Sequence, residues 1–138
     1  GFEDGDTSVS ACVPYYGVYD IASETGTSAA TVREKRLLAR MVMKTRDRAV
    51  YEAASPIAQV KGAPPFFVIH GSSDSLVEVA QARAFVDALR AVSHEPVAYA
   101  ELPGTQHAFD VFPSIRSAHV VRGVDRFLRA TYDRWVHG

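Results

Sequence analysis

Apolar and polar residues follow strand-length and helix-length patterns over the second half of the chain. Residues 64–71 form a continuous apolar run, PPFFVIHG, which favours a central parallel strand covered on both faces. Residues 77–92 predict a helix, residues 95–102 a second strand and residues 114–136 a last helix. This order, with short links between the elements, indicates a βαβ unit with a right-handed crossover.

The two predicted helices should turn their apolar faces toward the sheet. In the helix over 77–92 the apolar face consists of Val79, Ala82, Phe85, Val86 and Leu89. In the last helix the apolar stripe consists of Val120, Val121, Val124, Phe127 and Leu128. We expect Ser114 or Ser117 to cap the start of that last helix.

The first half of the chain is less regular. Residues 9–20 are apolar and aromatic and predict a strand of about six residues, although Pro14 favours an edge position or an early end. Thr31 and Glu34 match a capping box, so one or two helices are predicted over 31–54. The whole pattern predicts one α/β layer, at least three strands wide, with a mostly parallel sheet.

Composition is that of an ordinary globular domain: 138 residues, 47% hydrophobic and 22% charged. The formal net charge of −1 gives no electrostatic reason to expect a nucleic acid partner. The single cysteine, Cys12, excludes an internal disulfide, and no apolar run approaches the roughly 20 residues that span a bilayer. No Cys/His cluster and no helical histidine pair is present, so no metal is predicted. Because no methionine opens the sequence, we expect a piece of a longer protein, and its cellular location stays open.

Two polar clusters follow the two predicted strands. Asp74 lies a few residues after the first strand and His107 a few residues after the second, 33 residues later. That separation equals one crossover helix plus one strand, so both side chains should lie at the same edge of the sheet, where open α/β sheets bind ligands. A carboxylate there can accept a hydrogen bond from the imidazole, fix its tautomer and stabilise its protonated form. The spacing therefore predicts a paired general base.

Other interpretations of these side chains are open. Asp74 could cap the following helix, and His70 could hydrogen-bond to the backbone at the end of its strand. Surface positions are expected for His94, His119 and His137. Phe109 adjoins His107 and is the best candidate for a substrate pocket. The tyrosines that could join it, or could pack in the core instead, are Tyr15, Tyr16 and Tyr19.

Four segments together resemble the C-terminal part of an α/β-hydrolase: PPFFVIHGSSDSLV, ARAFVDALR, AELPGTQHAF and VDRFLRATYDRW. The likeness is to bacterial carboxylesterases and lipases of the hormone-sensitive-lipase and feruloyl-esterase-like type, and it covers roughly residues 55 to 134. It implies a three-layer αβα fold, of which residues 1–138 are the C-terminal portion of one domain. It also implies that Asp74 is the acid and His107 the base of a Ser-His-Asp triad, with no cofactor.

The resemblance has one large gap. The family's nucleophile lies in G-x-S-x-G on a strand-to-helix elbow ahead of the Asp and His, and this sequence contains no such motif. Its nearest imitation, GTSAA with Ser28, follows a polar segment instead of a buried strand. The resemblance therefore implies that the serine and the oxyanion loop precede Gly1, in a missing N-terminal half that is this chain's partner.

The resulting expectation is a carboxylic ester hydrolase, esterase or lipase, that acts on a small-molecule acyl ester, with this piece alone inactive. Two alternatives stay open. The chain could be a non-catalytic interaction module that self-associates through an exposed sheet edge. It could also belong to a serine peptidase of the prolyl-oligopeptidase type, in which the Asp and His follow the same order. The acyl length and the alcohol are not determined by the sequence.

Overall fold

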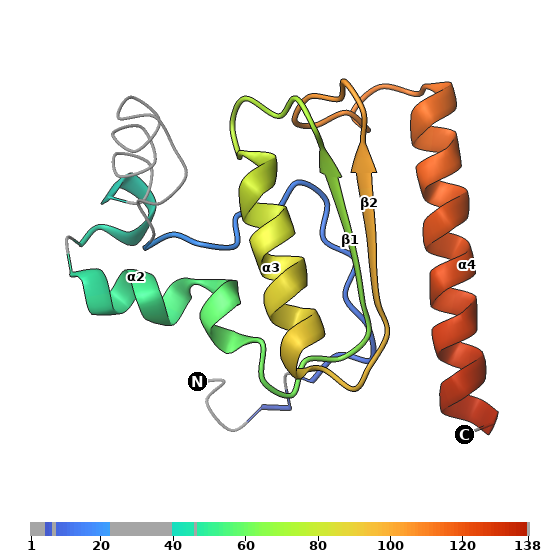
Figure 1. The fold of residues 1–138 in the computed structure, drawn as a ribbon, viewed down its shortest axis with the longest axis horizontal. Helices are drawn as coiled ribbons and strands as arrows, with labels where there is room; N and C mark the ends of the chain where they lie inside the picture. Colours follow the sequence, from blue (N-terminus) through green and yellow to red (C-terminus); the bar gives the residue numbers. More distant parts are fainter. Residues whose placement is uncertain (1–4, 7, 23–39, 46, 138) are drawn as a thin grey trace.

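The computed structural model describes residues 5–6, 8–22, 40–45 and 47–137 of the 138-residue chain (Figure 1). Its elements are α2 (Arg48–Ala54), the 3-10 helix η1 (Pro56–Gln59), β1 (Phe66–Gly71), α3 (Val79–Val92), β2 (Val97–Leu102) and α4 (Ile115–His137). The predicted strand–helix–strand–helix order of the second half is confirmed. Within the described residues, no helix combines the length and the apolar character needed to cross a membrane.

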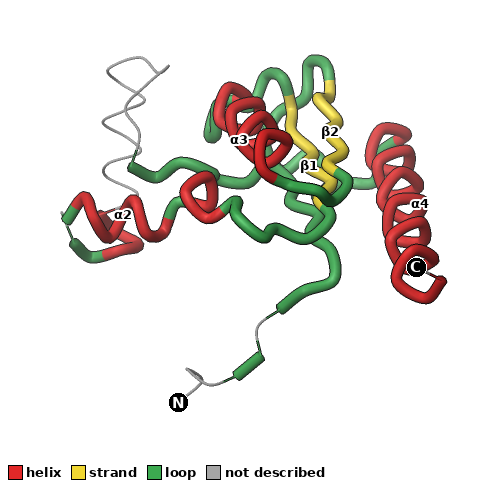
Figure 2. The backbone as a smooth tube through the Cα atoms, turned by 60° about the horizontal axis from the view of Figure 1, so that its bottom comes forward, coloured by secondary structure: helices red, strands yellow, loops and turns green. Residues whose placement is uncertain are grey.

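The sheet lies between two helices. β1 and β2 are parallel, with Phe66 opposite Val97 and Gly71 opposite Leu102, and α3 forms the crossover between them. Figures 1 and 2 show α3 on one side of the strands and α4 on the other. The predicted α/β class and its αβα layering are confirmed for the described part of the chain.

Successive side chains of β1 alternate between the two helices. On the α3 side, Val68 joins a core cluster with Tyr19, Ala82, Phe85, Val86 and Leu89. On the α4 side, the ring of Phe67 lies 5.6 Å from that of Phe127. Burying each large apolar side chain stabilises the fold by about 1.5–3 kcal/mol, so the α3 side, where the buried residues gather, holds the sheet most firmly.

The predicted strand over 9–20 is not formed as a continuous strand. The segment runs parallel to β1 and makes two isolated bridges, Cys12 with Phe66 and Tyr15 with Ile69. Pro14 explains the interruption: its carbonyl accepts a hydrogen bond from Ile69 N at 3.0 Å, but proline has no N–H to return one. The prediction of a sheet at least three strands wide is therefore wrong for the described residues, whose sheet has two strands.

The apolar stripe predicted for α4 is only partly buried. Val120 is buried, whereas Val121 and Leu128 are 60% and 43% exposed. A two-stranded sheet is too narrow to cover both flanks of the helix. The predicted cap is confirmed, because Ser114 Oγ accepts Ser117 N at 3.0 Å and Ser117 Oγ accepts Ser114 N at 2.8 Å. Ser28 and the capping box at Thr31 and Glu34 lie outside the described residues.

Candidate active site

Two loops meet at the carboxyl ends of the parallel strands, one following β1 and one following β2. In Figure 1 both lie beyond the arrowheads. Hydrogen bonds of backbone N–H groups join them: Gly104 N to Ser72 Oγ (2.9 Å), Ser73 N to Thr105 O (3.1 Å) and Ser75 N to Gln106 Oε1 (3.2 Å). The loops are thus fixed to each other as well as to their strands.

Gly71 permits this close approach. A Cβ atom at this position would lie 2.2 Å from the carbonyl oxygen of Thr105. That distance is far inside van der Waals contact, and the obstructing atom belongs to the backbone. On the other side, the turn after β2 is formed by Pro103 and Gly104, whose φ of +61° favours glycine. Both loops therefore depend on glycine at their tightest points.

The two loops bring together the side chains that the sequence placed at this edge. Nδ1 of His107 lies 2.8 Å from Oδ2 of Asp74. The Asp74 side chain is fully buried, whereas that of His107 is 29% exposed. Because an ionised carboxylate only accepts hydrogen bonds, Nδ1 carries the proton and Nε2 keeps its lone pair. In its neutral form the imidazole can then accept a proton at Nε2.

The other carboxylate oxygen of Asp74 closes its own loop. Oδ1 accepts hydrogen bonds from Leu76 N and Val77 N, both at 2.9 Å. Glu78, not Asp74, is the N-cap residue of α3, so the helix-cap interpretation of Asp74 is wrong. Asp74 caps a turn and faces His107 at the same time. These N–H donors compensate the carboxylate for its loss of water.

His70 also lies next to this pair. Its Nε2 is 2.8 Å from the carbonyl oxygen of Val77, which confirms the predicted backbone hydrogen bond. The same nitrogen is 3.4 Å from Oδ2 of Asp74, a proximity that the sequence analysis missed. The spacing of four residues between His70 and Asp74 was the available signal, because a tight turn after a strand can return the chain over that distance.

Aromatic side chains from the first segment flank the pair. The ring of Tyr16 lies 4.3 Å from that of His107, and its hydroxyl donates to Asp110 Oδ1 at 2.9 Å, which raises the pKa of Tyr16. Tyr15 stacks on Phe109 with ring centroids 5.8 Å apart. Tyr19 packs in the core, where burial raises its pKa to about 12. A pocket role for Phe109 stays a prediction.

The remaining histidines lie away from the pair. The predicted surface positions of His94, His119 and His137 are confirmed, since all three are exposed. Among the described residues, no group of three or more His, Cys, Asp or Glu side chains is placed to hold a metal ion.

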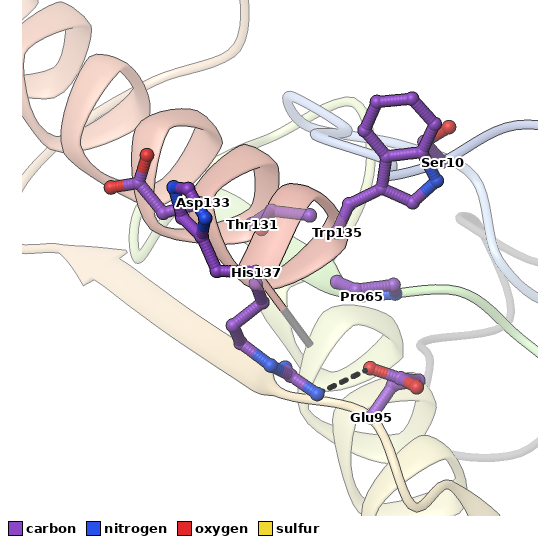
Figure 3. Close-up of a pocket in the computed structure, with 8 residues that line it drawn as sticks. Ser10, Pro65, Glu95, Thr131, Asp133, Trp135 and His137 are labelled. Carbon is purple, nitrogen blue, oxygen red and sulfur yellow. Dashed lines mark hydrogen bonds and ion pairs between the residues drawn. The ribbon is translucent and has the colours of Figure 1, made fainter.

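A cavity of about 700 Å³ lies at the opposite end of the strands. It is lined in part by Pro65 and Glu95, which precede β1 and β2, and by Trp135 near the end of α4 (Figure 3). Its polar contact in Figure 3 is the ion pair between Arg134 Nη2 and Glu95 Oε2, at 3.1 Å. Its position excludes a direct role in chemistry at Asp74 and His107, in spite of its size.

The family model BD-FAE matches residues 2–89, which is more than half of the chain. The chain belongs to the BD-FAE family. The match of the BD-FAE model includes Asp74 and ends before His107.

Two curated proteins of Mycobacterium tuberculosis (strain ATCC 25618 / H37Rv) are similar to this BD-FAE family member. The probable carboxylic ester hydrolase LipM is 52% identical over 136 residues, which cover 96% of this chain and 31% of LipM. Esterase LipQ is 45% identical over 140 residues, covering 97% of this chain and 32% of LipQ. The chain thus spans about a third of the length of these relatives.

A solved structure shares the fold. Thermogutta terrifontis esterase 2 phosphoramylated by tabun superimposes with a TM-score of 0.67 and 22% identity, covering 88% of this chain and 41% of that one. The BD-FAE family member therefore has part of an α/β-hydrolase-type fold, as the resemblance implied.

Proposed function

We propose that this chain supplies the acid and the base of a Ser-His-Asp triad in a longer carboxylic ester hydrolase, and that residues 1–138 are the C-terminal portion of one α/β-hydrolase domain. The observation that carries the proposal is the 2.8 Å contact between His107 Nδ1 and the buried carboxylate of Asp74. The names of LipM and LipQ, an ester hydrolase and an esterase, support the reaction class.

In this reaction His107 moves one proton twice. Its Nε2 takes the proton of a serine hydroxyl while the serine oxygen bonds to the acyl carbon of the ester. The carboxylate of Asp74 stabilises the imidazolium that forms. The imidazolium then donates the proton to the departing alcohol oxygen as the ester C–O bond breaks, which leaves an acyl-enzyme. In the second half of the reaction His107 takes a proton from a water molecule while the water oxygen bonds to the acyl carbon. It then donates that proton to the serine oxygen as the acyl–serine bond breaks, and the carboxylic acid is released.

The serine and the oxyanion donors come from an upstream segment that completes the site. The absence of G-x-S-x-G from the sequence supports this division. The substrate is a small-molecule acyl ester, no cofactor takes part, and Phe109 contributes to the acyl pocket because it lies two residues from His107. Without the upstream segment, an acid–base pair has no covalent step to assist.

The test is ester hydrolysis by the full-length protein with a short-chain nitrophenyl ester. We expect turnover that a serine-directed sulfonyl fluoride abolishes. His107→Ala should lower kcat/KM by roughly three orders of magnitude or more, and Asp74→Asn should lower it by a similar factor because the amide favours the wrong imidazole tautomer. The matched control is His94→Ala, an exposed histidine in the turn before β2 that should change kcat/KM less than about 2-fold.

Two results would contradict the proposal. One is activity that survives His107→Ala in the full-length protein. The other is serine-reagent-sensitive turnover by the 138 residues alone. Preferential cleavage of a prolyl peptide anilide over the ester would assign the same pair to a peptidase instead.

We also propose that the isolated chain self-associates through the segment 9–16. This segment lies along one side of β1, with Cys12 N donating to Pro65 O and Tyr16 N donating to Ile69 O. No described segment bonds to its other side. An unpaired edge of this kind favours pairing with a second strand.

A further inference from the structure

We infer that His70 is a positioning residue for the catalytic pair, acting through the turn that holds Asp74. This inference rests on the proposed function and adds a third residue to it. His70 is the fifth residue of β1, on the side of the sheet that α3 covers, and no part of it is exposed. A polar side chain at such a position has to be explained by what it bonds to.

The hydrogen bond of His70 has only one possible direction. The carbonyl oxygen of Val77 can only accept, so Nε2 of His70 carries a proton and donates it over 2.8 Å. Nδ1 of the same ring is buried and has no hydrogen-bond partner among the described residues. The polar contacts of this ring are therefore directed at the Asp74 turn, through Nε2.

Val77 connects His70 to the carboxylate. Its carbonyl accepts from His70, while its N–H donates to Asp74 Oδ1 at 2.9 Å. Val77 is itself only 6% exposed, so water cannot readily replace His70 as the donor to this carbonyl. Without His70, the peptide unit after Val77 would turn to satisfy the Val77 carbonyl elsewhere. The peptide unit before Val77, whose N–H fixes Asp74, shares the Cα atom of Val77 and would be displaced as well.

A second contact between His70 and Asp74 also stabilises the carboxylate. Nε2 of His70 is 3.4 Å from Oδ2 of Asp74, the same oxygen that faces His107 Nδ1. The positive end of the His70 N–H dipole thus lies beside the oxygen that must stay ionised. His70 holds the carboxylate in place through Val77 and stabilises its charge directly, and it touches no reacting atom.

The experiment compares His70→Gln with His70→Asn in the full-length protein. The Gln amide nitrogen can occupy the place of Nε2 and still reach Val77 O, whereas the shorter Asn places its amide near Nδ1 and cannot. We expect His70→Gln to keep kcat within about 3-fold, and His70→Asn to lower kcat by roughly 10–100-fold with KM changed less than about 3-fold. Both variants are neutral and polar, so a difference between them reports the hydrogen bond.

A double mutant separates positioning from a general effect on folding. If His70 acts through Asp74, His70→Asn should cost less than about 3-fold further in an Asp74→Asn background. The downfield Nδ1–H proton signal of His107 should persist in His70→Gln and be lost in His70→Asn. Thermal melting is followed for every variant.

The outcomes distinguish the two claims. Inactivity of the wild type, or full activity of His107→Ala, would overturn the proposed function. Two other results would overturn the positioning role alone, in a wild type whose activity depends on His107. One is equal kcat for His70→Asn and His70→Gln. The other is a loss of kcat from His70→Asn that is as large in the Asp74→Asn background as in the wild type. If His70→Asn does not fold, His70→Gln decides, because a 10-fold or larger loss of kcat in that folded variant contradicts the role.

Discussion

Gly71 is the residue at which the two site loops come closest. The Cβ atom of alanine there would lie 2.2 Å from Thr105 O, a backbone atom that can move only if the whole loop moves. We predict that Gly71→Ala destabilises the full-length protein by about 1–3 kcal/mol and also lowers kcat/KM, because separating the loops lengthens the contact between His107 and Asp74. Thermal melting and nitrophenyl ester hydrolysis measure the two effects.

Gly123 provides the matched control. It lies inside α4, where a Cβ atom would be 3.5 Å from the ring of Phe67, an ordinary van der Waals distance. Gly123→Ala should leave activity unchanged and stabilise the helix by up to about 1 kcal/mol. If Gly71→Ala melts and turns over like the wild type, the two loops do not approach as closely as described.

At the residue scale, the Asp74–His107 contact could be predicted because parallel topology alone brings the ends of neighbouring strands together. The contacts of Tyr16 and His70 depend on less regular geometry. Tyr16 reaches His107 from a segment interrupted by proline, at a φ of +39°, and no sequence pattern states where such a segment ends. His70 reaches Asp74 only because the turn after β1 folds back on the strand.

At the element scale, an ion pair ties α3 to β2. Arg83 donates to both carboxylate oxygens of Glu101, at 2.8 and 2.6 Å, and Tyr99 adds a third hydrogen bond at 2.8 Å. These hydrogen bonds lower the pKa of Glu101 from 4.5 to about 2, and those from Arg83 have the largest effect. A carboxyl group whose pKa is lower in the folded state stabilises that state only while it is ionised. Its contribution is complete above about pH 5 and is lost as the pH falls from 4.5 toward 2.

We therefore predict that Glu101→Gln removes part of the acid sensitivity of the fold. The free energy of unfolding of the full-length wild type should exceed that of the variant at pH 6, and the difference should shrink toward pH 2. Urea titrations at several pH values measure it. Glu52→Gln is the control, because Glu52 pairs with Arg48 within α2 and both side chains are more than half exposed. It should change stability by less than about 0.5 kcal/mol at any pH.

The elements themselves were predictable where local pattern and tertiary context agree. β1 is a continuous apolar run and α3 has an apolar face of helical period, and both contribute buried residues to the core cluster, against which Val97 and Tyr99 of β2 pack. The segment 9–20 has strand composition, but Pro14 removes one ladder hydrogen bond, and composition does not measure that loss. The stripe of α4 is as apolar as predicted, yet its burial depends on how wide the sheet is, which is a property of the whole fold.

At the scale of the whole molecule, the apolar surface is larger than the described sheet can cover. Among the most exposed large side chains are Ile115, Phe112 and Trp135, at 82%, 78% and 75%. The family relatives are about three times as long as this chain. Exposed apolar residues gathered on and around α4 fit a helix that further layers of a longer protein would cover.

The edge of segment 9–16 leads to a prediction for the isolated chain. In a parallel pairing, Cys12 and Tyr16 direct their N–H groups toward β1, so the alternate residues direct theirs away from it. We predict concentration-dependent association of the 138 residues, measured by size-exclusion chromatography with light scattering.

Val13→Pro should shift the protein toward monomer, because it removes an outward N–H and leaves the bonds to β1 in place. Val18→Lys, an exposed change outside this segment, should leave the association as it is. A chain that is monomeric at every concentration, or association unaffected by Val13→Pro, would show that this edge does not pair.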